Sequence, residues 1–134
     1  MDLSTVNWLA VVVCVVVAML SGFGWYHPKV FFTAWQAGLG KSGSTGNPNP
    51  VIYLFTIIAA LVQVISIWLV LNMMGSNTAG SGALGGFMLW LGFVAPTSLV
   101  NKLFAGYDIK VWAIEAGNHL LNFVLFGAIL AAWR

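Results

Sequence analysis

The side chains best able to do chemistry lie on one face of the last apolar stretch, residues 110–133. They stand at positions i, i+3, i+4 and i+7 of that stretch: Glu115, Asn118, His119 and Asn122. This spacing places all four on one side of an α-helix. A carboxylate one turn from an imidazole can hold a metal ion, pass a proton or bind a polar ligand. The same groups can also form a hydrogen-bonded network that only supports the fold.

The helix that must position these groups is long enough to cross a bilayer, which takes roughly 20 residues. Most of its other residues are apolar or small. A charge at the bilayer centre costs about 2.5–3.5 kcal/mol even on lenient insertion scales. We therefore expect the four polar side chains to face protein or a water-filled pocket, and Glu115 to be buried against His119 or Asn101.

Composition sets the class of protein. The chain has 134 residues, of which 60% are hydrophobic and only 6% are charged, whereas about 25% are charged in a soluble domain. It must be an integral membrane protein. Its net charge of +2 gives no reason to expect a nucleic-acid partner. The single cysteine, Cys14, excludes a disulfide framework and predicts a packing role.

Four apolar segments predict the fold, an all-α polytopic membrane protein forming one four-helix transmembrane bundle. We expect a single domain, residues 1–134, with spans at about 6–26, 51–74, 83–104 and 110–133. Asp2 with Ser4, and Asn49 with Pro50, are the expected helix starts. No Lys or Arg precedes the first segment, so we interpret it as a retained span. Residues 28–35 predict a short interfacial helix, and 41–50 predict a loop.

Basic residues predict the orientation. The first loop holds Lys29 and Lys41, and the third is flanked by Lys102 and Lys110, whereas the other side has only Arg134. Cytoplasmic loops carry the excess of Lys and Arg. We therefore expect both of these loops in the cytoplasm and both chain termini outside.

Depth along the four helices predicts where the polar groups collect. When depth is counted from the cytoplasmic ends of the helices at 1.5 Å per residue, the polar side chains lie in the cytoplasmic half of the bundle, as far as the midplane. This favours a closed pocket over a pore, which needs polar groups at every depth. The expected pocket residues are Glu115, Asn118, His119, Asn122, Asn101, Thr97, Ser98, Gln63 and Trp25. The lysines at its mouth, which favour an anion or anionic lipid, are Lys29, Lys102 and Lys110.

Proline and glycine predict the packing of the spans. Pro96 lies inside the third span, where it removes a backbone donor and frees the carbonyl of Gly92. The resulting kink either serves packing or opens space beside His119. Small residues recur at the four-residue spacing that lets membrane helices approach closely. These pairs are Gly82 with Gly86, Gly92 with Pro96, and Gly127 with Ala131.

Several aromatic and glycine motifs together resemble a known family. They are Trp25-Tyr26-x-Pro28-x-x-Phe31-x-x-x-Trp35, Trp90-Leu91-Gly92-Phe93-Val94, Leu103-Phe104-x-Gly106, Ala116-Gly117-x-His119 and Gly127-Ala128-Ile129. The pattern resembles the small bacterial membrane proteins catalogued as domain of unknown function 1761, over nearly the whole chain. The resemblance implies a four-span protein of a bacterial inner membrane. It implies no activity, cofactor or catalytic residue.

Three functional interpretations stay open at this point. A metal site built on Glu115 and His119 has no Glu-x-x-His or HExxH spacing to support it, and His27 is more typical of a polar interfacial residue than of a haem ligand. We expect no catalytic residue, metal or other cofactor. The favoured hypothesis is a non-enzymatic protein that self-associates or serves as an accessory subunit, with the lipid bilayer, copies of itself or other membrane chains as partners. The alternative is a small-ligand or proton-coupled transporter working as a homo-oligomer.

Overall fold

The computed structural model describes residues 2–40 and 49–133, and all of the regular structure in these residues is helical. Four helices are long and apolar enough to cross a membrane. They are α1 (Trp8–Trp25), α3 (Pro50–Met73), the continuous segment Ala79–Phe104 and α6 (Ile109–Ala132). The prediction of an all-α, four-span membrane fold is confirmed. The loop expected at 41–50 lies almost wholly outside the described residues, as do Lys41 and Arg134.

The third span is built from three pieces: α4 (Ala79–Leu89), a π-helical turn η2 (Trp90–Val94) and α5 (Ala95–Phe104). In the π turn, the backbone N–H of Ala95 donates to the carbonyl of Trp90, five residues back. This turn ends two residues before Pro96, which cannot donate a backbone hydrogen bond. The irregularity expected at Pro96 therefore takes the form of a widened turn.

Local capping explains where the helices begin. Asn49 caps α3 by accepting from the N–H of Val51, and Pro50 stands in the first turn, as expected. The start expected at Asp2 and Ser4 is wrong. These residues belong to the short 3₁₀ turn η1 (Leu3–Thr5) and its cap, and α1 begins at Trp8. Asn7 sets that start because its side chain accepts from the N–H of Ala10.

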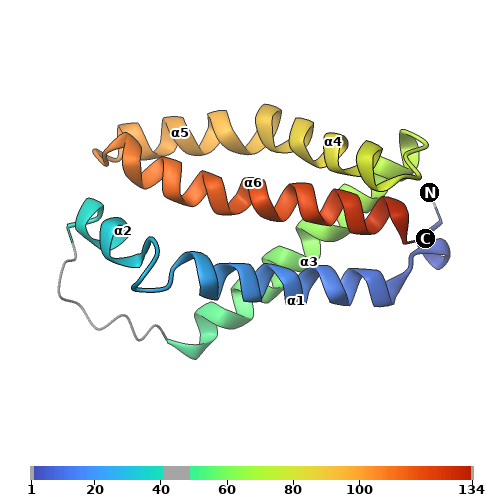
Figure 1. Ribbon diagram of the computed structural model, residues 1–134, viewed down its shortest axis with the longest axis horizontal. Helices are drawn as coiled ribbons and strands as arrows, with labels where there is room; N and C mark the ends of the chain where they lie inside the picture. Colours follow the sequence, from blue (N-terminus) through green and yellow to red (C-terminus); the bar gives the residue numbers. More distant parts are fainter. Residues whose placement is uncertain (1, 41–48, 134) are drawn as a thin grey trace.

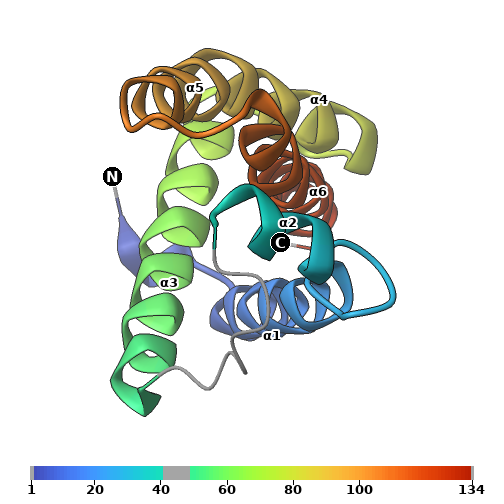
Figure 2. The same cartoon turned by 90° about the vertical axis from the view of Figure 1, so that its left-hand side faces the viewer.

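The interfacial helix expected over residues 28–35 begins later, as α2 (Phe32–Gly38). The intervening residues form a tight reversal in which the N–H groups of Val30 and Phe32 both donate to the carbonyl of His27. Because of this reversal, α2 turns back toward the bundle. Figure 2 shows it lying across the end of the bundle between α1 and α6.

The two chain ends meet at one end of the molecule, opposite α2 and the turn between α5 and α6 (Figure 1). The side-chain amide of Asn7 donates to the backbone carbonyl of Trp133 at 3.2 Å. The dry core lies in this half of the bundle, where α1, α3 and α6 pack together. Its members include Ala10, Val11, Cys14, Val64, Ile67, Leu71, Phe126 and Leu130. Cys14 is fully buried there, in the packing role that the sequence predicts.

Helices α4 and α6 make the closest contact in the bundle. A Cβ placed on Gly82 would collide with the backbone carbonyl of Gly127, and one placed on Gly86 would collide with that of Phe123. Only glycine allows two backbones to approach in this way. Two of the expected small-residue pairs therefore serve this contact. Around Gly92, by contrast, nothing in the described chain lies within 4 Å of the added atom.

Helix α3 leaves the bundle as it approaches the end that carries α2. Figures 1 and 2 show that its start lies far from α5, on the opposite side of the molecule. Residues 50–59 are all exposed, and burial begins at Ala60. None of the first ten residues of α3 is buried within the described chain, whereas its second half belongs to the core.

Candidate functional site

Glu115 ties together three elements at the α2 end of the bundle. Its Oε1 lies 3.0 Å from Nζ of Lys102 on α5, and its Oε2 accepts from the indole N–H of Trp35 on α2 at 2.9 Å. The carboxylate is therefore engaged on both sides by charge-assisted contacts. Of the two partners expected for Glu115, His119 or Asn101, His119 interacts electrostatically with the carboxylate, whereas Asn101 is exposed and the side chain of Lys102 reaches Glu115 instead.

Aromatic contacts hold α2 in the position that this tie requires. The ring of Trp35 meets that of Tyr26 edge-on at 5.2 Å, and Trp25 packs on Phe31 at 4.8 Å. At the far end of α2, Gly38 lies so close to Val111 that a Cβ there would meet the valine side chain. Burial, together with the nearby Glu115 carboxylate, raises the pKa of the Tyr26 phenol.

Hydrogen bonds from further tryptophan side chains link neighbouring elements to the first half of α6. The indole N–H of Trp25 on α1 donates to the carbonyl of Ile114 at 2.8 Å, and that of Trp90 in η2 donates to the carbonyl of Ala116 at 2.9 Å. From α6 itself, Trp112 donates to the carbonyl of Ala95. Each indole thus uses its single donor within the bundle. Of these tryptophans, only Trp25 is among the pocket residues expected from the sequence, although a tryptophan inside a span needs an acceptor.

The next polar side chains along α6 differ in their hydrogen bonding. Asn118 is only 6% exposed, and its Oδ1 has no hydrogen-bond partner among the residues that the structure describes. His119 is half-buried, and no described residue forms a hydrogen bond with its imidazole. Asn122, one turn deeper than Asn118, accepts from the hydroxyl of Ser21 on α1, which also contacts the carbonyl of Ala18.

The remaining expected pocket residues do not join this group. Thr97 and Asn101 are exposed on α5. Ser98 donates to the carbonyl of Val94 at 2.7 Å, so its hydroxyl serves the π turn and does not face a pocket. Of the mouth lysines, Lys102 is held by Glu115, whereas Lys29 and Lys110 are exposed. In the described part of the chain, no three side chains of His, Cys, Asp or Glu gather as metal ligands would.

Gln63 lies in a groove where α3 begins to part from the third span. The groove has a volume of about 300 Å³. Its walls come from α3, the end of α4, the π turn and α6. The lining residues are Val62, Gln63, Ser66, Ile67, Val70, Leu89, Phe93, Val94 and Phe123. It is mainly apolar, and Gln63 and Ser66 are its polar members.

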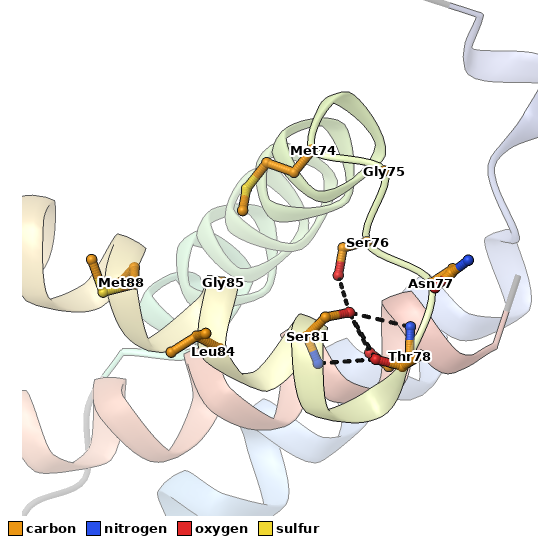
Figure 3. Close-up of a pocket in the computed structure, with 9 residues that line it drawn as sticks. All are labelled: Met74, Gly75, Ser76, Asn77, Thr78, Ser81, Leu84, Gly85 and Met88. Carbon is orange, nitrogen blue, oxygen red and sulfur yellow. Dashed lines mark hydrogen bonds between the residues drawn. The ribbon is translucent and has the colours of Figure 1, made fainter.

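A second pocket, of about 350 Å³, lies at the connection between α3 and α4. Figure 3 shows the hydroxyl group of Ser81 hydrogen-bonded to those of Ser76 and Thr78 along one side, with Met74, Leu84 and Met88 also lining the pocket. Thr78 and Ser81 also form the capping box that begins α4. These polar atoms already serve the start of a helix.

Comparison with known proteins gives one match. A family model described as "Protein of unknown function (DUF1761)" matches residues 9–131. No curated protein matches the chain, and no solved structure matches it.

Proposed function

This chain belongs to the DUF1761 family of proteins of unknown function, and we propose that it is a non-enzymatic structural subunit of the membrane, assembling with copies of itself or with other membrane chains. The observation that carries this proposal is the exposed first half of α3. Ten consecutive residues, 50–59, are exposed around the whole helix, and they include Phe55 at 65% exposure. A neighbouring transmembrane helix would cover this surface.

The state of Glu115 supports the non-enzymatic part of the proposal. A general acid or base needs free access to the group with which it exchanges a proton. The carboxylate of Glu115 is instead engaged by Lys102 and Trp35, and these contacts join α2 and α5 to α6. In this proposal, Glu115 has the structural role of holding the α2 end of the bundle together.

Native mass spectrometry after gentle extraction from the source membrane tests the proposal. We expect the chain to run as a small homo-oligomer or within a larger membrane complex. A lone monomer, extracted under conditions in which known membrane complexes in the same sample stay intact, would overturn it. The variant Phe55→Ala tests whether the assembly uses the first half of α3. Phe104→Ala, at an exposed residue of α5, is its matched control.

A second candidate function, small-ligand or proton-coupled transport by a homo-oligomer, is favoured by Asn118. A buried acceptor without a partner costs about 1–3 kcal/mol, and a bound polar molecule would satisfy it. The variant Asn118→Leu separates the two functions. If Asn118 only packs, thermal stability in detergent stays equal or rises, whereas loss of a bound molecule lowers it and removes that molecule from the native mass spectrum.

Orientation and location complete the proposal. The excess of Lys on the side of α2 and of the turn between α5 and α6 favours a cytoplasmic position for both, with the chain ends outside. The family resemblance favours a bacterial inner membrane. Labelling with a membrane-impermeant thiol reagent tests this. We expect an exposed Lys29→Cys to react only in opened cells and an exposed Leu3→Cys to react in intact cells.

A further inference from the structure

Gln63 places an amide near the middle of the membrane with nothing in the described chain to bond it. It lies thirteen residues into α3, which at 1.5 Å per residue is about 20 Å from the start of the helix. The side chain is only part-buried, and no described residue forms a hydrogen bond with it. Lipid acyl chains offer neither donor nor acceptor. Some other polar group must therefore satisfy the amide.

The residues around Gln63 form a continuous face along α3 that the bundle leaves open. They recur at alternating steps of four and three residues, the spacing by which two long helices pack side by side. This face, the α3 seam, consists of Ile52, Thr56, Ala59, Gln63, Ser66 and Val70. Each of the six is exposed or part-buried. The buried side of α3, which carries Val64, Ile67 and Leu71, points elsewhere.

The groove described above runs beside the α3 seam. Gln63, Ser66 and Val70 form one of its walls, and Phe93, which is 72% exposed, stands on the other. A helix packed on the seam would place its side chains in this groove. The seam and the groove therefore make one continuous surface, with the amide at its centre.

We propose that the α3 seam is the contact between two copies of this chain, in which the two Gln63 amides hydrogen-bond each other across a two-fold axis. This inference rests on the proposed subunit role and names the partner. A two-fold contact brings the same residue of each copy to the axis. An amide carries both donors and an acceptor, so it complements a second copy of itself.

Other features of the seam fit an identical partner. None of its six residues is charged, so two copies do not repel each other. Thr56, Ala59 and Ser66 are small, which allows two helices to approach closely. The hydroxyl groups of Thr56 and Ser66 lie about two turns and one turn from Gln63, on either side of it. A lipid would leave the amide unsatisfied, whereas a second copy supplies its partner at the same depth.

Disulfide crosslinking in membranes tests the geometry. Cys14 is the single native cysteine and is fully buried, so the unmodified chain serves as the background that does not crosslink. We expect Ala59→Cys and Ser66→Cys to give a disulfide-linked dimer on oxidation. Ile58→Cys is the matched control, because Ile58 is 46% exposed and points about 100° away from Ala59. Equal crosslinking at residues 58 and 59, or none on the seam, would overturn the proposal.

Substitution of the amide tests the chemistry. Because no described residue bonds Gln63, we expect Gln63→Leu to leave thermal stability of the monomer unchanged. It should weaken dimerisation about tenfold, measured by energy transfer between labelled chains diluted in lipid vesicles. Gln63→Asn retains an amide and should retain more of the affinity. Unchanged energy transfer in Gln63→Leu would overturn the role of the amide.

The same experiments distinguish failure of this inference from failure of the proposed function. If seam cysteines do not crosslink but native mass spectrometry finds the chain with other proteins, the subunit role stands and the homodimer is wrong. If the chain is monomeric in both, the two proposals fall together.

Discussion

Replacing Gly82 with alanine tests the contact on which the α4–α6 pair depends. The added Cβ would meet the backbone carbonyl of Gly127 and the Cβ of Ala131. A backbone carbonyl cannot rotate aside as a flexible side chain can, so the two helices must separate. Overpacking costs about 1–3 kcal/mol, and a collision with backbone belongs at the upper end of that range.

The same helix contains the control that isolates this steric cost. Gly80 has nothing within 4 Å of an added Cβ among the described residues. Both substitutions share the gain in helix propensity, up to about 1 kcal/mol. We therefore expect Gly80→Ala to be neutral or stabilising and Gly82→Ala to be destabilising, with a difference of about 3 kcal/mol.

The assay is thermal unfolding of the purified chain in mild detergent, followed by size-exclusion chromatography with fluorescence detection. A difference of about 3 kcal/mol corresponds to roughly 12 °C in Tm, at about 4 °C per kcal/mol for a chain of this size. Gly86→Ala and Gly92→Ala form a second matched pair, since only Gly86 faces a backbone carbonyl. Equal Tm values within each pair would refute the close contact.

Three further predictions concern the polar contacts. Ser21→Ala leaves the buried Asn122 amide without its donor, so it should cost about 1–3 kcal/mol in thermal unfolding, and a second change, Asn122→Leu, should restore much of that loss. Glu115→Ala removes the acceptor that holds α2, so amide hydrogen exchange across residues 32–38, measured by mass spectrometry, should rise at least several-fold. Lys102→Met removes only a part-exposed ion pair, so it should lower the free energy of unfolding by no more than about 1 kcal/mol. Trp35→Phe keeps an aromatic ring at residue 35 but removes the indole N–H that donates to Glu115, so it should raise exchange over the same residues as Glu115→Ala does. Unchanged exchange would contradict a role for this hydrogen bond in holding α2.

The membrane class and the four spans are predictable from the sequence because each depends on a property of a single segment. Length and hydropathy along one stretch determine whether it can cross a bilayer. The helical spacing of Glu115, Asn118 and Asn122 likewise needs no knowledge of the rest of the chain. These predictions concern local structure, and they agree with the helices observed.

The partners of the polar face depend on how distant segments meet, which spacing along one helix cannot reveal. The bond from Trp35 to Glu115 requires the chain to reverse at His27 and bring α2 back over the bundle. Gln63 illustrates the same limit. Its depth along α3 can be counted from the sequence, but the direction in which it points depends on the angle at which α3 leaves the bundle.

The π turn has a consequence for the rotational setting of the third span. An i→i+5 turn holds one residue more than the α-helical turn it replaces, and each residue of an α-helix advances the face by about 100°. Removal of one residue from Trp90–Val94 would therefore restore an α-helical turn and keep α5 in register with α4, whereas insertion of a second extra residue would rotate α5 by about 100° relative to α4. The glycine face of α4 would stay on α6, while Lys102 would swing away from Glu115. The two halves of this span thus make separate contacts with α6, and the number of residues in the π turn determines whether both contacts can form at once.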